Sequence, residues 1–193
     1  MHSIYLYNSI YNRRTEVTTK KADAPIEEVT PSLINDTGDA VTLTLPDGTE
    51  CTIDKNSPEY KLFAALNSDD EVNPDDTKDW ITMDKLVFEK GKVKLTTPEA
   101  ETQLKNIAAI LKFFPNSCVK IGGFSDNTGT KDVNLKISAE RAKNAAQNLV
   151  DLGIAADRIT QKGYGIENPV CPANDTENCR AANRRIDVKV IQK

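Results

Sequence analysis

The chain has 193 residues, of which 38% are hydrophobic and 28% are charged. This balance is typical of a soluble globular protein with one ordinary domain and a small extension. The formal net charge of −4 argues against a nucleic-acid-binding protein, which usually carries a basic surface. No apolar run approaches the roughly 18 residues of a membrane helix, so an integral membrane protein of the helical type is not expected.

The first seven residues form a short, mostly apolar run, but Arg13 and Arg14 follow this run instead of preceding it. A secretory signal places its charge first, then about 7–15 apolar residues and a small-residue cleavage site. We therefore expect either a cytosolic protein or an exported one whose signal is absent from this sequence.

Residues 1–40 are polar and lack sustained periodicity, which predicts a flexible tail or linker. Residues 41–53 alternate between apolar and polar side chains, and Asp47-Gly48 separates two strand-like runs. This pattern predicts a β-hairpin.

A short helix is predicted next, with Ser57 as its N-cap and Pro58 at its first position. Its apolar stripe would consist of Tyr60, Phe63 and Leu66. Residues 67–79 carry six acidic side chains, but the glycine and the ligand offsets of a calcium loop are missing. A solvated acidic linker is the better interpretation, so residues 41–79 are predicted to form a hairpin-plus-helix extension and a linker. A second hypothesis is that residues 1–79 bind a protein partner.

From residue 80 onward, strands and helices alternate. Thr97-Pro98 opens an amphipathic helix, and Ser138 can cap a second one. Strands are predicted at residues 81–88, 119–124, 159–164 and 186–190, the last after a long loop. The resulting order, β-α-β-α-β-β, predicts an α+β fold with helices on one face of a four-stranded sheet.

Asp126 follows the strand at residues 119–124, whose low polarity predicts a buried, central position in the sheet, and Arg141 lies in the next helix. With Ser138 as N-cap, Arg141 would be the third helical residue, close to the positive end of the helix dipole. Arginine binds carboxylates through two parallel hydrogen bonds, and an aspartate accepts from an ammonium. The pair therefore predicts a ligand that carries both an ammonium and a carboxylate.

Two simpler interpretations of these residues stay open. Asp126 and Arg141 could form a structural ion pair, since such pairs are frequent and often contribute little. The turn from Asp126 to Gly129 could also be a loop closure in which Asp126 accepts hydrogen bonds from nearby backbone N–H groups.

Of the four cysteines, Cys171 and Cys179 flank a short loop rich in turn-forming residues. A disulfide between them would contribute roughly 2–3 kcal/mol by closing that loop, and two free thiols are the alternative. Cys51 and Cys118 are interpreted as small buried apolar residues. No CxxC motif is present, which disfavours a zinc or thioredoxin-like site.

Several motifs follow one another in fixed order within residues 80–193. They are Phe88 and Leu95, the run 122–129 (GGFSDNTG), Asn134, Ile137-Ser138 with Arg141-Ala142, Gly153-Ile154, Gly163-Tyr164-Gly165, Asn168-Pro169 and Asn183-Arg184-Arg185. In this pattern the chain resembles the OmpA-like C-terminal domain, the peptidoglycan-binding module of Pal lipoproteins and MotB stators. The resemblance implies a mixed four-stranded sheet and covers about three-fifths of the chain.

The resemblance also implies a ligand, the diaminopimelate of the peptidoglycan stem peptide. Asp126 and Arg141 match the central charged pair, and Asn134 matches a side-chain donor or acceptor. Ser125 would line the site through its backbone, although the family more often has threonine there. Arg184 would add a second positive group.

The resemblance places Glu89 where some members carry an aspartate near the ligand. The Cys171–Cys179 loop resembles the disulfide loop of some members and so favours an oxidising compartment. A further departure is Ile137, which stands in place of the usual leucine. Neither this departure nor Ser125 removes a charge from the implied site.

The implied function is non-covalent binding of peptidoglycan in the periplasm, tethering the outer membrane or a lipoprotein to the wall through an anchor that lies outside this sequence. A stator or scaffold role with the same module is the nearest alternative. An enzyme is less expected because His2 is the single histidine and no Gly-rich phosphate loop occurs. A two-carboxylate glycan hydrolase using Asp126 and Glu89 has no support beyond the presence of the acids. No cofactor and no metal are expected.

Overall fold

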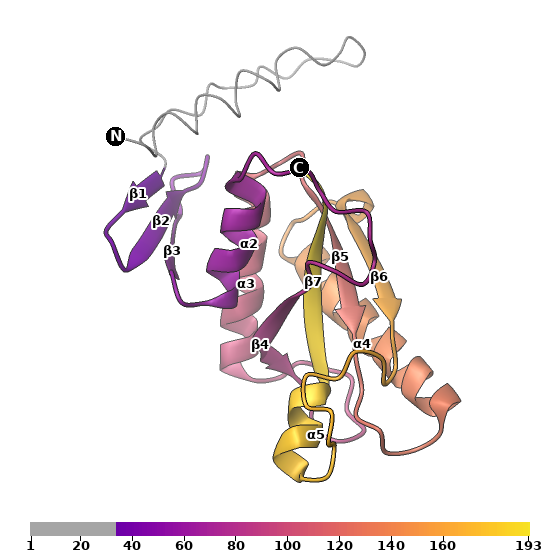
Figure 1. The fold of residues 1–193 in the computed structure, drawn as a ribbon. Coiled ribbons are helices and arrows are strands. Elements are labelled where there is room, and N and C mark those ends of the chain that lie inside the picture. Colours follow the sequence, from indigo (N-terminus) through magenta and orange to yellow (C-terminus); the bar gives the residue numbers. More distant parts are fainter. Residues whose placement is uncertain (1–33) are drawn as a thin grey trace.

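The structure is a computed structural model that describes residues 34–193 and contains two sheets (Figure 1). Most of the predicted tail lies outside the described residues, but strand β1 (Ile34–Asp36) falls within it. Strand β2 (Ala40–Thr44) pairs with both β1 and β3 (Glu50–Asp54), forming an antiparallel sheet. The extension therefore begins earlier than residue 41.

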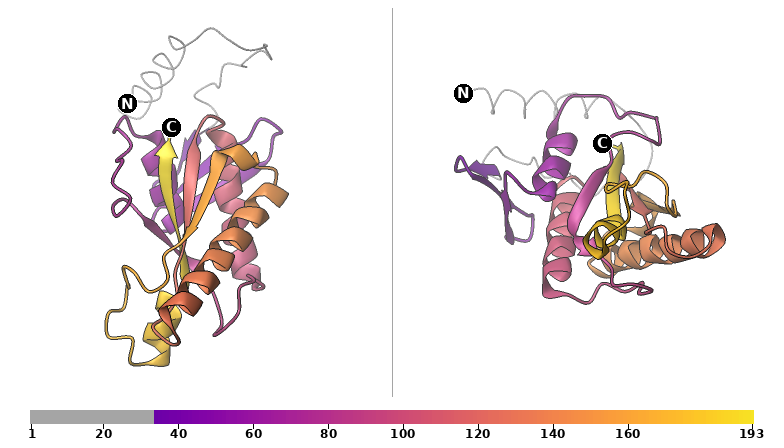
Figure 2. Two further views of the ribbon diagram at one scale, coloured as in Figure 1. Left: turned by 90° about the vertical axis from the view of Figure 1, so that its right-hand side faces the viewer. Right: turned by 60° about the horizontal axis from the view of Figure 1, so that its bottom comes forward.

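The predicted hairpin and the helix after it are confirmed. Gly48 has a φ of +79°, a conformation that glycine adopts without a Cβ clash and that the turn between β2 and β3 requires. Helix α2 (Pro58–Asn67) is capped by Ser57, whose hydroxyl accepts a hydrogen bond from the Tyr60 amide at 3.2 Å. Figure 2 shows the three-stranded sheet, drawn in indigo, beside α2 and apart from α4.

The second sheet has the strand order β4-β7-β5-β6. Its strands are β4 (Ile81–Val87), β5 (Cys118–Gly123), β6 (Ile159–Gly163) and β7 (Arg185–Gln192). Strands β5 and β6 are parallel, whereas β7 is antiparallel to both of its neighbours. The predicted mixed α+β fold is confirmed, including the central position of β5.

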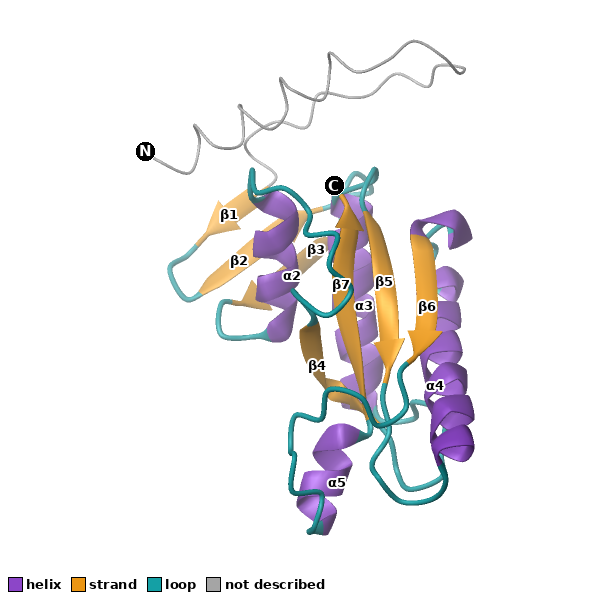
Figure 3. Ribbon diagram, turned by 45° about the vertical axis from the view of Figure 1, so that its right-hand side comes forward, coloured by secondary structure: helices purple, strands orange, loops and turns teal. Residues whose placement is uncertain are grey.

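Helices α3 (Pro98–Phe113) and α4 (Lys131–Asp151) lie behind this sheet in Figure 3. Thr97 caps α3 as predicted, and Gly153 with a φ of +94° follows the end of α4. A 3-10 turn (Ala156–Arg158) leads into β6. The region predicted as a long loop before the last strand contains the short helix α5 (Glu177–Asn183), which Thr176 caps.

The prediction that Ser138 caps the second helix of the module is wrong. Helix α4 begins eight residues earlier, because the hydroxyl of Thr130 accepts from the Val133 amide at 3.3 Å. Ser138 lies inside the helix, where its hydroxyl donates to the Leu135 carbonyl at 2.9 Å and accepts from the Gly165 amide at 2.8 Å. Its role is to join α4 to the loop after β6.

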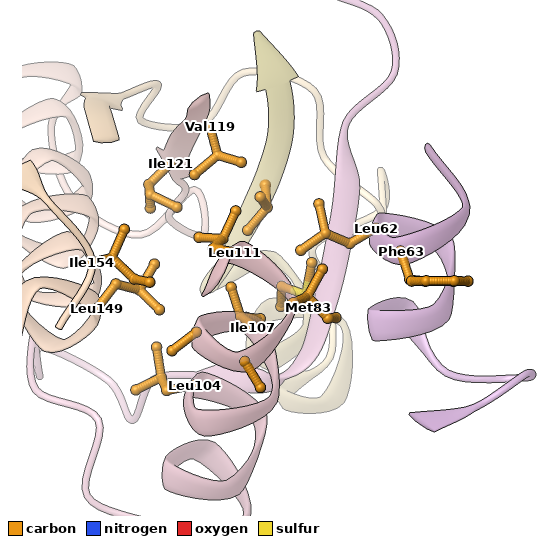
Figure 4. Close-up of a cluster of buried hydrophobic side chains, with 14 of the residues drawn as sticks. Leu62, Phe63, Met83, Leu104, Ile107, Leu111, Val119, Ile121, Leu149 and Ile154 are labelled. Carbon is orange, nitrogen blue, oxygen red and sulfur yellow. The ribbon is translucent and has the colours of Figure 1, made fainter. Parts of the chain in front are cut away.

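One hydrophobic core joins the extension to the second sheet. In Figure 4, Leu62 of α2 lies near Met83 of β4 and Ile107 of α3, and the same cluster continues to Ile121 of β5. All four of these side chains are at most 1% exposed. This core contains residues from both sides of the boundary predicted at residue 79. The division of the chain at that residue stays a prediction.

Residues 68–80, here named the strap, run across the face of the second sheet opposite α3 and α4 (Figure 3). The Lys189 ammonium of β7 donates to the carbonyls of Asp75 and Lys78, the latter at 2.9 Å. Lys120 of β5 pairs with Asp76 at 2.6 Å. Part of the segment predicted to be a solvated linker, residues 67–79, thus covers the buried ammonium of Lys189, while its own side chains are exposed or half-buried. The assignment of these residues as a linker stays a prediction. The hypothesis of a protein partner for residues 1–79 stays a prediction.

Candidate functional site

The candidate site lies at the end of the second sheet where β5 and β6 end and β7 begins (Figure 1). Asp126 lies in the loop after β5, Arg141 on α4, and Arg184 between α5 and β7. All three side chains are at most 4% exposed. Charged groups buried to this extent need partners, because isolated buried charges are strongly unfavourable.

Both oxygens of the Asp126 carboxylate are occupied. Its Oδ1 accepts from the Thr128 amide at 2.9 Å and from the Thr128 hydroxyl, and its Oδ2 accepts from Arg184 at 2.8 Å. Burial raises the pKa of Asp126, but the hydrogen bonds from Thr128 and Arg184 outweigh it and hold the pKa below its usual range. The carboxylate is therefore ionised at neutral pH.

Arg184 links three elements at the site. Its Nε donates to the Phe88 carbonyl at 2.8 Å, one terminal nitrogen donates to Asp126, and the other donates to Glu177 of α5 at 2.6 Å. Burial lowers the pKa of Arg184, but the hydrogen bonds to the two carboxylates outweigh this effect and raise the pKa above its usual value. Because Glu177 is well exposed and Asp126 is buried, the Asp126 bond is the better shielded of the two.

Arg141 is held by backbone carbonyls. Its Nε donates to Lys92 and one terminal nitrogen donates to Phe124, both at 3.0 Å, and the other reaches Glu89 at 3.4 Å. Its guanidinium also lies 4.8 Å from the centre of the Phe88 ring. Burial and the neighbouring Arg184 lower the pKa of Arg141 to about 10, which still leaves it charged at neutral pH.

Two sequence-based interpretations of Arg141 are corrected by this geometry. Asp126 forms its ion pair with Arg184, so the structural pair between Asp126 and Arg141 is absent from the described residues. Arg141 also lies well inside α4, which begins at Lys131, and so it is far from the first turn and its dipole. The predicted loop closure is confirmed, since Asp126 accepts from the Thr128 amide.

The remaining predicted site residues lie around this group. Asn134 is buried, and its side-chain amide makes no hydrogen bond within residues 34–193. The Ser125 amide donates to the Gly165 carbonyl at 2.8 Å, while the buried hydroxyl of Ser125 has no hydrogen-bond partner among the described residues. Glu89 approaches the site through its carbonyl, and its exposed side chain lines a groove of about 460 Å³ formed within residues 87–97.

The guanidinium groups retain donors for a ligand. Each nitrogen of Arg141 and of Arg184 already donates once, and each terminal nitrogen has a second N–H. The three buried side chains are two cations and one anion, and Asp126 pairs with Arg184 alone, so the charge of Arg141 is not neutralised by a buried carboxylate. Such an arrangement favours a ligand with a carboxylate.

Two residues of this network were missed from the sequence, Thr128 and Glu177. Threonine two residues after an aspartate is a known turn pattern, so the Thr128 contact had a local signal. Glu177 and Arg184 are seven residues apart, which places them on one face of a helix, but only if α5 is recognised. Thr176, the N-cap of α5, was the signal for that helix.

The disulfide predicted between Cys171 and Cys179 is present, with a Cα–Cα distance of 5.3 Å. Cys51 is free and buried as interpreted, whereas Cys118 is free but only half-buried. Within residues 34–193, no group of three or more acidic, histidine or cysteine side chains is arranged to hold a metal ion. Among the helices of the same residues, none has the length and apolar character needed to cross a bilayer.

A family model described as the OmpA family matches residues 87–184, just over half of the chain. The chain belongs to the OmpA family. The match includes Asp126, Asn134, Arg141 and Arg184, so the candidate site lies inside the family domain. The extension and the strap precede it.

Two curated relatives and one solved structure illustrate the similarity within the OmpA family. The probable lipoprotein YiaD of Escherichia coli is 34% identical over 103 residues, covering 53% of this chain and 46% of that protein. The peptidoglycan-binding protein ArfA of Mycobacterium bovis is 42% identical over 87 residues, covering 45% of this chain and 26% of that protein. The chain thus spans less than half the length of either relative. The crystal structure of the peptidoglycan-associated lipoprotein from Burkholderia pseudomallei aligns with a TM-score of 0.52 and 27% identity, covering 54% of this chain and 87% of that one.

Proposed function

We propose that this domain binds peptidoglycan non-covalently through the diaminopimelate of the stem peptide. The observation that carries the proposal is the pair of buried guanidinium groups, Arg141 and Arg184, that retain free N–H donors beside the ionised Asp126. The far end of the diaminopimelate side chain carries an ammonium and a carboxylate on one carbon. Both groups find a complement at this site.

In the proposed complex, the ligand carboxylate accepts from the terminal nitrogens of Arg141. The ligand ammonium donates to Asp126, whose two oxygens have lone pairs beyond those used by Thr128 and Arg184. The side-chain amide of Asn134, which makes no hydrogen bond within the part of the chain that the structure describes, supplies a further polar contact. Charge-assisted hydrogen bonds contribute about 1.5–3 kcal/mol each, so a few of them support micromolar affinity.

The names of two similar proteins support this role. ArfA is named a peptidoglycan-binding protein, and the Burkholderia pseudomallei structure is a peptidoglycan-associated lipoprotein. We accordingly propose that the chain acts by binding and not by catalysis, in the periplasm, and that it connects the wall to the outer membrane through an anchor. A stator or scaffold role would use the same wall contact.

The test is co-sedimentation with purified peptidoglycan sacculi. Asp126→Asn removes the charge that would attract the ammonium, and Arg141→Lys removes the planar donor group that would bind the carboxylate. The matched control is Arg158→Lys, because Arg158 also donates to backbone carbonyls, those of Leu111 and Ser117, but next to the start of β5. The wild type and Arg158→Lys should sediment with sacculi, and the two site variants should not. Sedimentation of both site variants at the wild-type level would disprove the site.

Calorimetric titration separates diaminopimelate from lysine as the recognised residue. A stem peptide with diaminopimelate should bind the wild type more tightly than the same peptide with lysine, which lacks the terminal carboxylate. In Arg141→Lys this preference should shrink, because the partner of that carboxylate has lost its fork geometry. Equal affinity of the wild type for both peptides would refute the assigned role of Arg141.

A further inference from the structure

The strap is fixed to the second sheet through its own backbone. The ammonium of Lys189, a side chain only 2% exposed, has the strap carbonyls of Asp75 and Lys78 as its partners. Lys193 donates to the carbonyls of Ser68 and Asp70 at 3.1 and 2.7 Å. Because a buried ammonium needs these acceptors, leaving the sheet would be costly for the strap.

At its carboxyl end the strap contacts two aromatic residues of the family domain. The Asp76 carboxylate accepts from the Tyr164 hydroxyl at 2.8 Å, and the Trp80 indole N–H donates to the Asp76 carbonyl at 2.7 Å. The Trp80 ring meets Phe124 and Tyr164 edge-on, at centroid distances of 6.3 and 5.4 Å. Phe124 and Tyr164 stack on each other at 5.2 Å. Asp76 and Trp80 therefore hold this stacked pair from outside.

The same two aromatic residues carry the backbone that presents the site. The Phe124 carbonyl accepts from Arg141, and Asp126 follows only two residues later. The Tyr164 amide donates to the Gly123 carbonyl, and the next residue, Gly165, accepts from the Ser125 amide at 2.8 Å. The loop after β5 is thus fixed on one side by α4 and on the other by residues that the strap holds.

We infer that the strap is a positioning element for the ligand site, acting through Asp76 and Trp80 on the stacked Phe124–Tyr164 pair. This inference rests on the proposed function, because it concerns the affinity of that site. No residue of the strap is assigned to ligand contact. A docked strap keeps the carbonyl of Phe124 aimed at Arg141, and a displaced strap lets the loop from 124 to 128 move and weakens ligand binding.

The experiment uses the full chain with two variants that each remove the strap contact, meaning the hydrogen bond from the Tyr164 hydroxyl to the Asp76 carboxylate. Asp76→Ala removes the acceptor from the strap side, and Tyr164→Phe removes only the hydroxyl and keeps the ring stack. Asp69→Ala is the matched control, since Asp69 is an exposed acid of the same segment. Ile53→Val is the control for a purely structural effect, because it loosens the core of the extension without touching the strap contact.

The first measurement is the dissociation constant for a diaminopimelate stem peptide, at a temperature where every variant is folded. Asp76→Ala and Tyr164→Phe should each weaken binding about five- to ten-fold, and the two control variants should bind like the wild type. Trp80 is the single tryptophan of the chain, so its emission should change when either strap variant is compared with the wild type. Wild-type affinity in both strap variants, or an equal loss in Ile53→Val, would overturn the inference.

The second measurement needs no ligand and therefore separates the inference from the proposed function. Amide hydrogen exchange at Ser125 and Thr128 should accelerate in the two strap variants and stay unchanged in Asp69→Ala. If the wild type fails to bind the stem peptide while this exchange accelerates, the proposed function is wrong and the positioning role stands. If the exchange is unchanged in both strap variants, the positioning role is wrong.

Discussion

Replacing Gly123 by alanine tests the packing that holds Arg141 in place. Gly123 ends β5 directly against α4, and a Cβ at this position would lie 2.0 Å from the Ser138 carbonyl oxygen and 3.0 Å from the Ala142 nitrogen. Carbon–oxygen contacts of this kind are normally about 3.3 Å or longer, so strand and helix must separate by roughly 1.3 Å. Both obstructing atoms belong to the helix backbone, which cannot turn aside as a side chain would.

The expected cost follows from this overlap. Overpacking a close-packed interior typically costs about 1–3 kcal/mol, and an unyielding backbone contact places Gly123→Ala at about 3 kcal/mol or above. For a chain of this size, such a loss lowers the melting temperature by roughly 6–12 °C. The hydrogen bond from Arg141 to the Phe124 carbonyl, now 3.0 Å, spans the same interface and would break, so affinity for the stem peptide should fall at least about ten-fold.

Urea denaturation measures the stability change, and calorimetry without denaturant measures the affinity. The neighbouring substitution Gly122→Ala serves as the comparison, because a Cβ there would meet the side chains of Trp80 at 2.9 Å and Phe124 at 3.1 Å. These rings can shift by a few tenths of an ångström, so the expected loss is nearer 1 kcal/mol. A loss below 1 kcal/mol in Gly123→Ala, or equal losses in the two variants, would refute the reasoning.

Three further predictions concern the charges and the disulfide. Because the folded pKa of Asp126 lies below its unfolded value, its ionic contribution is complete above about pH 4 and is lost as the pH falls through the folded pKa. Wild-type stability in acid titrations should therefore decrease more steeply below about pH 4 than that of Asp126→Asn, and parallel curves would contradict this. Thr128→Val removes the hydroxyl donor and should raise the pKa of Asp126, measured from the carboxyl carbon shift by NMR; an unchanged pKa would contradict the contact. Reducing the Cys171–Cys179 bridge, which joins residues eight apart, should cost about 2.5 kcal/mol in urea denaturation and should have no effect on a Cys171→Ser/Cys179→Ser double variant.

Local signals account for the parts of the fold that the sequence predicted correctly. Ser57 and Thr97 each precede a proline at the start of a helix, and Asp47-Gly48 marks a two-strand turn. The low polarity of β5 correctly indicated a strand with a neighbour on each side. Each of these signals depends only on residues near one another in the chain.

The start of α4 was missed because its inward face is polar there. Asn134, Ser138 and Arg141 are all buried, so the apolar spacing that identifies a helix begins only at Ala142. Both Thr130 and Ser138 are suitable N-cap residues, and the apolar pattern favoured the later one. The residues that broke the pattern are those of the candidate site, which is where local rules are expected to fail.

The pairing of Asp126 with Arg184 could not be obtained from spacing, because 58 residues separate the two. The docking of the strap onto the sheet was equally hard to predict from the sequence. Its acidic composition indicated a solvated segment, but its docking depends on Lys120 and Lys189, which only the register of β5 with β7 brings to one face. Long-range pairings of this kind appear only when the sheet order is known.

The choice of partners for the two arginines supports the proposed preference of the site for an anionic ligand. Had Arg141 paired with Asp126, each charge would have neutralised the other, and a carboxylate ligand would have had to displace an internal partner. Arg141 instead binds neutral carbonyls, which satisfy its geometry without cancelling its charge. The lowering of its pKa to about 10 reflects the cost of that burial, yet the group stays protonated at neutral pH. In the proposed complex, a carboxylate that enters beside Arg141 gains a charge-assisted contact that a neutral amide cannot match, so the proposed selectivity for an anionic end group rests on the kind of acceptor that surrounds Arg141.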